Sequence, residues 1–80
     1  MNIYRISQDG NTRYDTYDSA VVVAENEEDA RSIHPDGGEF DPNEGWPTWC
    51  KQKEDVKVEY MGIADKSLKR GVILSSFNAG

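Results

Sequence analysis

The chain passes from strand to helix within residues 19–30, where SAVVVA (Ser19–Ala24) runs directly into ENEEDA (Glu25–Ala30). Three consecutive valines between small residues are typical of a central β-strand that is covered on both faces. Asn26 is a suitable helix N-cap, and the three acidic residues after it lie where the helix dipole favours negative charge. We therefore expect a central strand followed by a short helix. Pro35 should end that helix, because the residue before a proline avoids the helical conformation.

Other β-rich segments lie on both sides of this strand–helix unit. Asn2–Ser7 and Val56–Gly62 alternate between apolar and polar residues, and Val72–Leu74 is a short apolar run. The order β-β-α-β-β predicts one small two-layer α+β domain over residues 1–80, with the helix on one face of a mainly antiparallel sheet. A mixed sheet is the alternative, because the direct step from the SAVVVA strand through the helix would also allow a parallel neighbour.

The segment between the helix and the third strand is long and irregular. Residues 34–55 read HPDGGEFDPNEGWPTWCKQKED and hold all three prolines, both tryptophans and the only cysteine. Irregular loops of this length are usually functional or disordered. Two tryptophans argue against disorder. Either they pack this loop onto the core, or they are presented to a partner.

Composition narrows the compartment and the partners. The 80 residues include 9 basic and 15 acidic side chains, for a net charge of -6, and the basic residues are not clustered. That balance disfavours direct binding to nucleic acid or to anionic membranes. The single cysteine excludes an intrachain disulfide, and no apolar run resembles a signal peptide or a membrane span. We expect a soluble intracellular protein. Because the core of so short a chain is thin, homodimerisation is a side hypothesis.

The residue types needed for catalysis or for metal binding are sparse. Cys50 and His34 would form a nucleophile–base pair only if their side chains met, and nothing in the sequence brings them together. One Cys and one His cannot supply the four ligands of a structural zinc site. The acidic run from Asp36 to Glu44 does not match a calcium-binding EF-hand loop, and no glycine-rich phosphate motif occurs. We therefore predict no enzymatic activity, no cofactor and no metal.

Aromatic and acidic residues in and near the long loop are the best candidates for a binding surface. Tryptophan is enriched in interface hot spots, and it is also what a small core uses when aliphatic residues are few. Two tyrosines in a polar segment form a second aromatic cluster, flanked by aspartates. If the clusters lie together, an acidic aromatic groove results, which would accept Arg or Lys from a protein with a basic surface and would repel phosphates. The predicted partner-binding residues are Trp46, Trp49, Glu39, Asp41 and Glu44, followed by Tyr14 and Tyr17.

Three segments of the chain resemble a family of small uncharacterised proteins encoded by tailed bacteriophages and prophages. They are YDTYDSAVVVAENEEDARSIHPDG (Tyr14–Gly37), VKVEYMGIA (Val56–Ala64) and GVILSSFNAG (Gly71–Gly80). The resemblance covers about two-thirds of the chain and carries no known activity and no functional residues. It implies a phage accessory protein that acts in the cytoplasm of the host bacterium.

The first functional hypothesis is therefore non-catalytic binding: an accessory protein that binds and modulates a host protein, with a component of antiviral defence as one possible target. The alternative is a protein that sequesters a nucleotide or another small molecule in a pocket between the sheet and the Trp loop. A minor virion or assembly protein is the third hypothesis.

Overall fold

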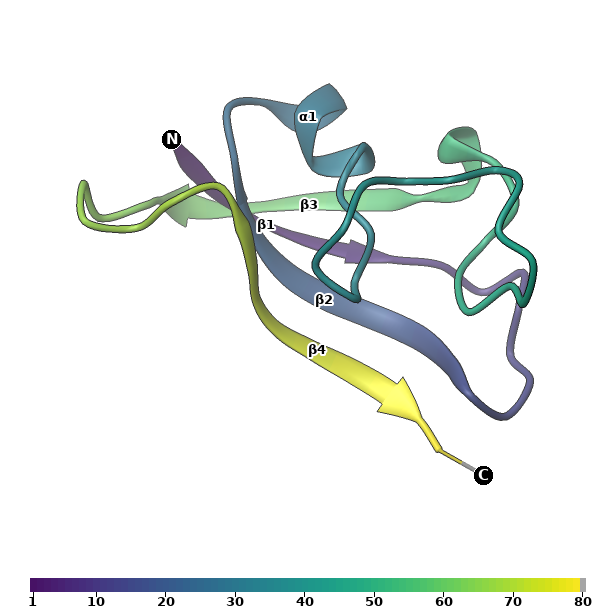
Figure 1. The fold of residues 1–80 in the computed structure, drawn as a ribbon. Coiled ribbons are helices and arrows are strands. Elements are labelled where there is room, and N and C mark those ends of the chain that lie inside the picture. The colour runs from purple at the N-terminus through teal and green to yellow at the C-terminus, as the bar shows by residue number, and fades with distance from the viewer. Residues whose placement is uncertain (80) are drawn as a thin grey trace.

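The computed structural model, which describes residues 1–79, contains one antiparallel sheet with the strand order β3-β1-β2-β4 (Figure 1). The sheet confirms the α+β prediction. The mixed-sheet alternative is wrong, because β1 lies between β2 and β3 and pairs with both of them in the antiparallel direction. The elements in chain order are β1 (Asn2–Ser7), β2 (Thr16–Ala24), α1 (Glu27–Arg31), the 3-10 turn η1 (Lys53–Asp55), β3 (Lys57–Ile63) and β4 (Gly71–Asn78).

Helix α1 begins where its capping residues predict. The Asn26 side chain accepts a hydrogen bond from the Asp29 amide at 2.8 Å. The Asp29 carboxylate in turn accepts one from the Glu25 amide at 2.9 Å, so side chains satisfy amides at both ends of the first turn. A helix of five residues is too short to be stable in isolation. Its stability must come from packing, and Ala30 is the residue that it buries.

The prediction that Pro35 ends the helix is wrong, because α1 already ends at Arg31. The Phe40 amide donates to the Ser32 carbonyl at 2.8 Å, and Ile33 forms an isolated antiparallel bridge with Glu39. The chain after Arg31 therefore pairs with the loop that follows it instead of continuing the helix. This pairing is a tertiary contact, which a local proline signal does not report.

One face of the sheet is covered by α1 and by residues 34–55, which we call the Trp loop (Figure 1). The buried cluster beneath them contains residues from β1, β2, α1 and the loop. Trp49 is its largest fully buried side chain, with 2% of its surface exposed. Its members are Tyr4, Ile6, Ala20, Val22, Ala24, Ala30, Ile33, Trp49, Cys50 and Val56. The second layer of the domain is thus mostly irregular loop.

Among residues 1–79, neither α1 nor the Trp loop covers the opposite face of the sheet, which we call the open face (Figure 1). Val22 of β2 is fully buried, whereas Val21, whose side chain points the other way, is partly exposed. Leu74 pairs with Val21 and has 67% of its surface exposed. The expectation that the valine-rich strand is covered on both faces is confirmed only in part, because Val22 and Val23 are both buried and point to opposite faces, whereas Val21 is partly exposed.

Both outer strands carry a bulge. The register shifts by one residue at Met61 in β3 and at Ile73 in β4. Gly62 and Gly71 adopt φ values of 149° and 144°, which side-chain-bearing residues rarely adopt. β4 is longer than the apolar run predicts. Its Phe77 packs edge-on against Tyr17 with ring centroids 4.8 Å apart.

Replacing each tryptophan separately should lower the stability of the fold strongly in one case and hardly at all in the other. Trp49→Ala leaves a large cavity under the sheet and should lower the free energy of unfolding by about 3–5 kcal/mol. Trp46 is 75% exposed, so Trp46→Ala should change it by less than about 0.5 kcal/mol. Urea denaturation followed by circular dichroism measures both values. Equal losses in the two variants would contradict the assignment of Trp49 as the core residue.

Candidate functional site

The buried imidazole of His34 anchors the Trp loop from within. The Asp36 amide donates to His34 Nδ1 at 3.0 Å, which leaves Nε2 to face Glu44 Oε1 at 2.9 Å. The other oxygen of Glu44 accepts the Thr48 amide at 2.6 Å. Glu44 therefore ties the beginning of the loop to the segment that follows Trp46. A carboxylate that bonds an imidazole and a backbone amide in a partly buried position is a strong tether.

A second clamp joins the Trp loop to the turn between β1 and β2. The side chain of Asn11 donates to the carbonyls of Pro47, at 3.2 Å, and Trp49, at 3.1 Å. Buried Gln8 holds Asn11 in place, because its amide group bonds both the backbone N–H and the carbonyl of that residue at 2.7 Å. The backbone on both sides of Trp46 is thus fixed by groups outside the tryptophan side chain.

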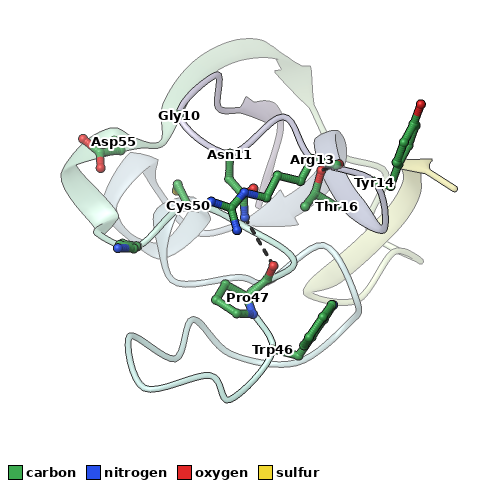
Figure 2. A pocket seen from close by; sticks show the side chains of 10 residues that line it. Gly10, Asn11, Arg13, Tyr14, Thr16, Trp46, Pro47, Cys50 and Asp55 are labelled. Atoms are coloured by element: carbon green, nitrogen blue, oxygen red, sulfur yellow. Dashed lines mark hydrogen bonds between the residues drawn. The ribbon is translucent and has the colours of Figure 1, made fainter. Parts of the chain in front are cut away.

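Two of the predicted partner-binding residues are free at the surface near this clamp. Trp46 has 75% and Tyr14 has 74% of its surface exposed. The alternatives that the sequence left open are therefore divided, since Trp46 is presented and Trp49 is core. Figure 2 shows Trp46 and Tyr14 on different sides of one groove, with the Tyr14 ring directed away from its centre.

The other predicted residues have structural partners. Tyr17 is half-buried and packs edge-on against His34 as well as Phe77. Glu39 binds the guanidinium of Arg70 at 2.7 Å, and this contact, followed by that with Asp29, raises the pKa of Arg70. Asp41 accepts the amide of Asn43, which closes a turn. Glu44 is the tether described above. These residues hold the loop together, and the surface near Trp46 does not contain them.

The groove has a volume of about 490 Å³ and lies between the β1–β2 turn and the Trp loop (Figure 2). This volume is within the range of small-molecule sites, about 300–1,000 Å³. The hydrogen bond from Asn11 to Pro47 crosses its floor. We call this cavity the aromatic groove. Its lining residues are Gly10, Asn11, Arg13, Tyr14, Thr16, Trp46, Pro47, Cys50, Lys51 and Asp55.

The charge of the aromatic groove differs from the prediction. It contains two cations, Arg13 and Lys51, and one acid, Asp55. Among residues 1–79, neither cation has an ion-pair or side-chain hydrogen-bond partner. The expectation of an acidic groove that repels phosphate is therefore wrong. Sequence reasoning missed both cations, because they are 38 positions apart and tertiary contacts, the Asn11 clamp and the hydrogen bond from the Tyr17 amide to the Thr48 carbonyl, bring their segments together.

Cys50 is buried and unsuited to nucleophilic chemistry. Burial, with the charge of Asp55 as the second cause, raises the pKa of its thiol from 9.0 to about 11. Its sulfur donates to the Gln52 carbonyl at 3.5 Å. A thiol with a raised pKa is almost entirely protonated at neutral pH, whereas reactive cysteines have a lowered one.

His34, Asp36 and Glu44 are the residues that come closest to a metal-binding group within the described part of the chain. One ligand atom from each lies within 4.8 Å of the others. Three such groups are fewer than the four ligands of a structural zinc site. Each carboxylate also accepts a backbone amide, from Gly38 and Thr48 respectively. Hydrogen bonding within the loop thus accounts for the cluster.

No family model, curated protein or solved structure matches this chain. Among the residues that the structure describes, no helix has the length and apolar character needed to cross a membrane. The function must therefore be argued from the geometry of the groove.

The raised pKa of Cys50 predicts a loss of stability at alkaline pH. Because the folded state holds the thiol proton more tightly, the associated stability is complete below the unfolded pKa near 9 and is lost as pH rises towards about 11. The slope should reach about 1 kcal/mol per pH unit. Urea denaturation at pH 8 and at pH 10.5 should show a larger loss in the native sequence than in Cys50→Ala. Equal losses in both proteins would exclude this contribution of the thiol.

Proposed function

We propose that this protein is a non-catalytic binding module, a phage accessory protein that binds and modulates a host protein through the aromatic groove. One observation carries the proposal: Trp46 is 75% exposed although the backbone around it is fixed by the Asn11 clamp and the Glu44 tether. An exposed tryptophan held in this way loses little conformational entropy on binding, and tryptophan is among the residues enriched in hot spots.

The charges of the groove indicate which part of a host protein it would accept. Arg13 and Lys51 favour a segment that carries an acidic side chain beside an apolar or aromatic one. The net charge of -6 predicted a partner with a basic surface. The groove instead favours an acidic partner segment, and the excess of negative charge lies on the rest of the molecule. Because Tyr14 is directed outward, it would lie at the rim and Trp46 nearer the centre.

A pull-down from host lysate with matched variants tests this proposal. Trp46→Ala should reduce capture of the partner at least tenfold, as expected for the loss of a hot-spot side chain. Tyr60→Ala is the control, because Tyr60 is also an exposed aromatic residue, at 58%, but lies on β3 outside the groove. Capture should be confirmed by titrating the purified partner. Equal capture by the native protein and both folded variants, or equal loss in both variants, would contradict the site.

The second candidate function is sequestration of a small anionic aromatic molecule such as a nucleotide. The specific observation in its favour is that Arg13 and Lys51 both line the groove and have no ion-pair partner among residues 1–79. An indole can stack on a base while two cations meet a phosphate. This candidate differs from the first in needing no protein surface.

A melting-temperature screen against nucleotides separates the two candidates. At about ten times the Kd, a ligand should stabilise the fold by about 1.4 kcal/mol, or roughly 6–10 °C for so small a domain. Arg13→Ala/Lys51→Ala should abolish the shift. Lys66→Ala/Lys69→Ala is the matched control, because it removes two cations outside the groove. The absence of a shift with any nucleotide would reject this candidate and leave the first one standing.

A further inference from the structure

The open face of the sheet has a regular pattern that the aromatic groove does not explain. The strand register aligns side chains into transverse rows across all four strands, in the order β3-β1-β2-β4. The three rows that point towards the open face are Lys57–Ser7–Ser19–Ser76, Glu59–Arg5–Val21–Leu74 and Gly62–Ile3–Val23–Gly71. The face thus changes from hydroxyl-bearing at one end to apolar at the other.

Its apolar part is incompletely covered. Val23 is buried, but Val21 is only partly buried and Leu74 is 67% exposed. The total accessible surface of 5195 Å² exceeds the value of about 4,850 Å² expected for a monomer of this mass. A sheet normally buries its apolar face against another layer.

The charges on this face favour a second copy of the chain as that layer. The chain as a whole has 15 acidic residues, so most of its surface would repel a copy of itself. The three rows, however, contain one acid, Glu59, and two bases, Arg5 and Lys57. Beside them, Asp9 binds Lys57 at 2.8 Å and Asp18 accepts the Ser19 hydroxyl at 3.1 Å, so two bases stand against three acids and the local charge is small. The face therefore combines apolar character with little electrostatic repulsion between identical chains.

We propose that the open face binds a second copy of this chain, giving a two-fold symmetric dimer with one sheet packed on the other. In a two-fold interface the same patch serves both subunits. The middle row around Arg5, Val21 and Leu74 forms the centre, where a hollow of about 210 Å³ that these residues help to line receives side chains of the other copy. Glu59, on the outer strand β3, lies nearer the rim.

The size of the face bears on the strength of the dimer. Four strands about 4.8 Å apart and three rows about 7 Å apart give a footprint of roughly 400 Å² in projection. Such an interface is at or below the lower end of the standard size. Buried area does not set affinity by itself, but so small an interface is typical of weak, transient association, which we expect below about 1 mM protein. The dimer leaves the aromatic groove of each subunit free, because the groove belongs to the Trp loop on the other side of the sheet.

Sedimentation velocity over a concentration series tests the proposal. The native protein should rise from 9.0 kDa towards twice that mass as the concentration increases. Leu74→Glu should remain at 9.0 kDa with unchanged circular dichroism, because it places an unpaired charge at the hollow that the other copy would fill. Ile63→Glu is the matched control. Ile63 is also an exposed strand residue, at 80%, but pairs with Asn2 and so points away from the open face.

Three results would overturn the proposal. The first is a native protein that stays monomeric up to about 1 mM. The second is a Leu74→Glu variant that associates as the native protein does, and the third is an Ile63→Glu variant that loses association as Leu74→Glu does. The second result would indicate pairing through the strand edges, which the Leu74 side chain does not control.

If Leu74→Glu does not fold, Arg5→Glu replaces it. Arg5 has no side-chain hydrogen-bond partner within residues 1–79, and its replacement puts two acids side by side on each face. Arg5→Glu should weaken association at least tenfold, and unchanged association would also overturn the proposal.

Discussion

Burial of Trp49 holds the second layer of this domain against its sheet. Helix α1 has only five residues, so most of the covering layer is irregular chain that has no hydrogen-bonded repeat of its own. The indole provides the largest fully buried side chain, and Cys50 of the loop and Val56, which follows the loop, join the same cluster. The indole N–H has no partner among the described residues, which costs about 1–3 kcal/mol. Apolar burial must therefore exceed that cost for the loop to stay in place.

The burial of Trp49 explains why Trp46 is exposed. Once Trp49 is fixed, the two residues that separate it from Trp46 leave little freedom, and Asn11 and Glu44 bond most of the polar groups in that stretch. Acidic residues are used inside the loop as tethers, while Arg13 and Lys51 are left without such partners. A chain with a strongly negative net charge thus presents positive charge in its aromatic groove.

Local patterns in the sequence predict local structure well here and long-range structure less well. The alternation in β1 and β3 and the N-cap at Asn26 are properties of adjacent residues, and the structure contains them where they are expected. The early end of α1, the strand order and the aromatic groove depend on contacts between distant segments, such as Phe40 with Ser32 and Asn11 with Pro47. Composition leaves open whether each tryptophan is core or presented to a partner, because that depends on where the Asn11 and Glu44 bonds fix the backbone.

The strand order also has a consequence for how the chain emerges from the ribosome. The two central strands, β1 and β2, are complete by Ala24, whereas both outer strands come after Asp55. The first hairpin is therefore synthesised with two unpaired edges, and it keeps them until Lys57–Ile63 and then Gly71–Asn78 become available. Unpaired edges of apolar strands are templates for adding other chains. Nascent copies on neighbouring ribosomes would be most prone to aggregate during this interval. Rapid translation of the second half of the chain would shorten the interval.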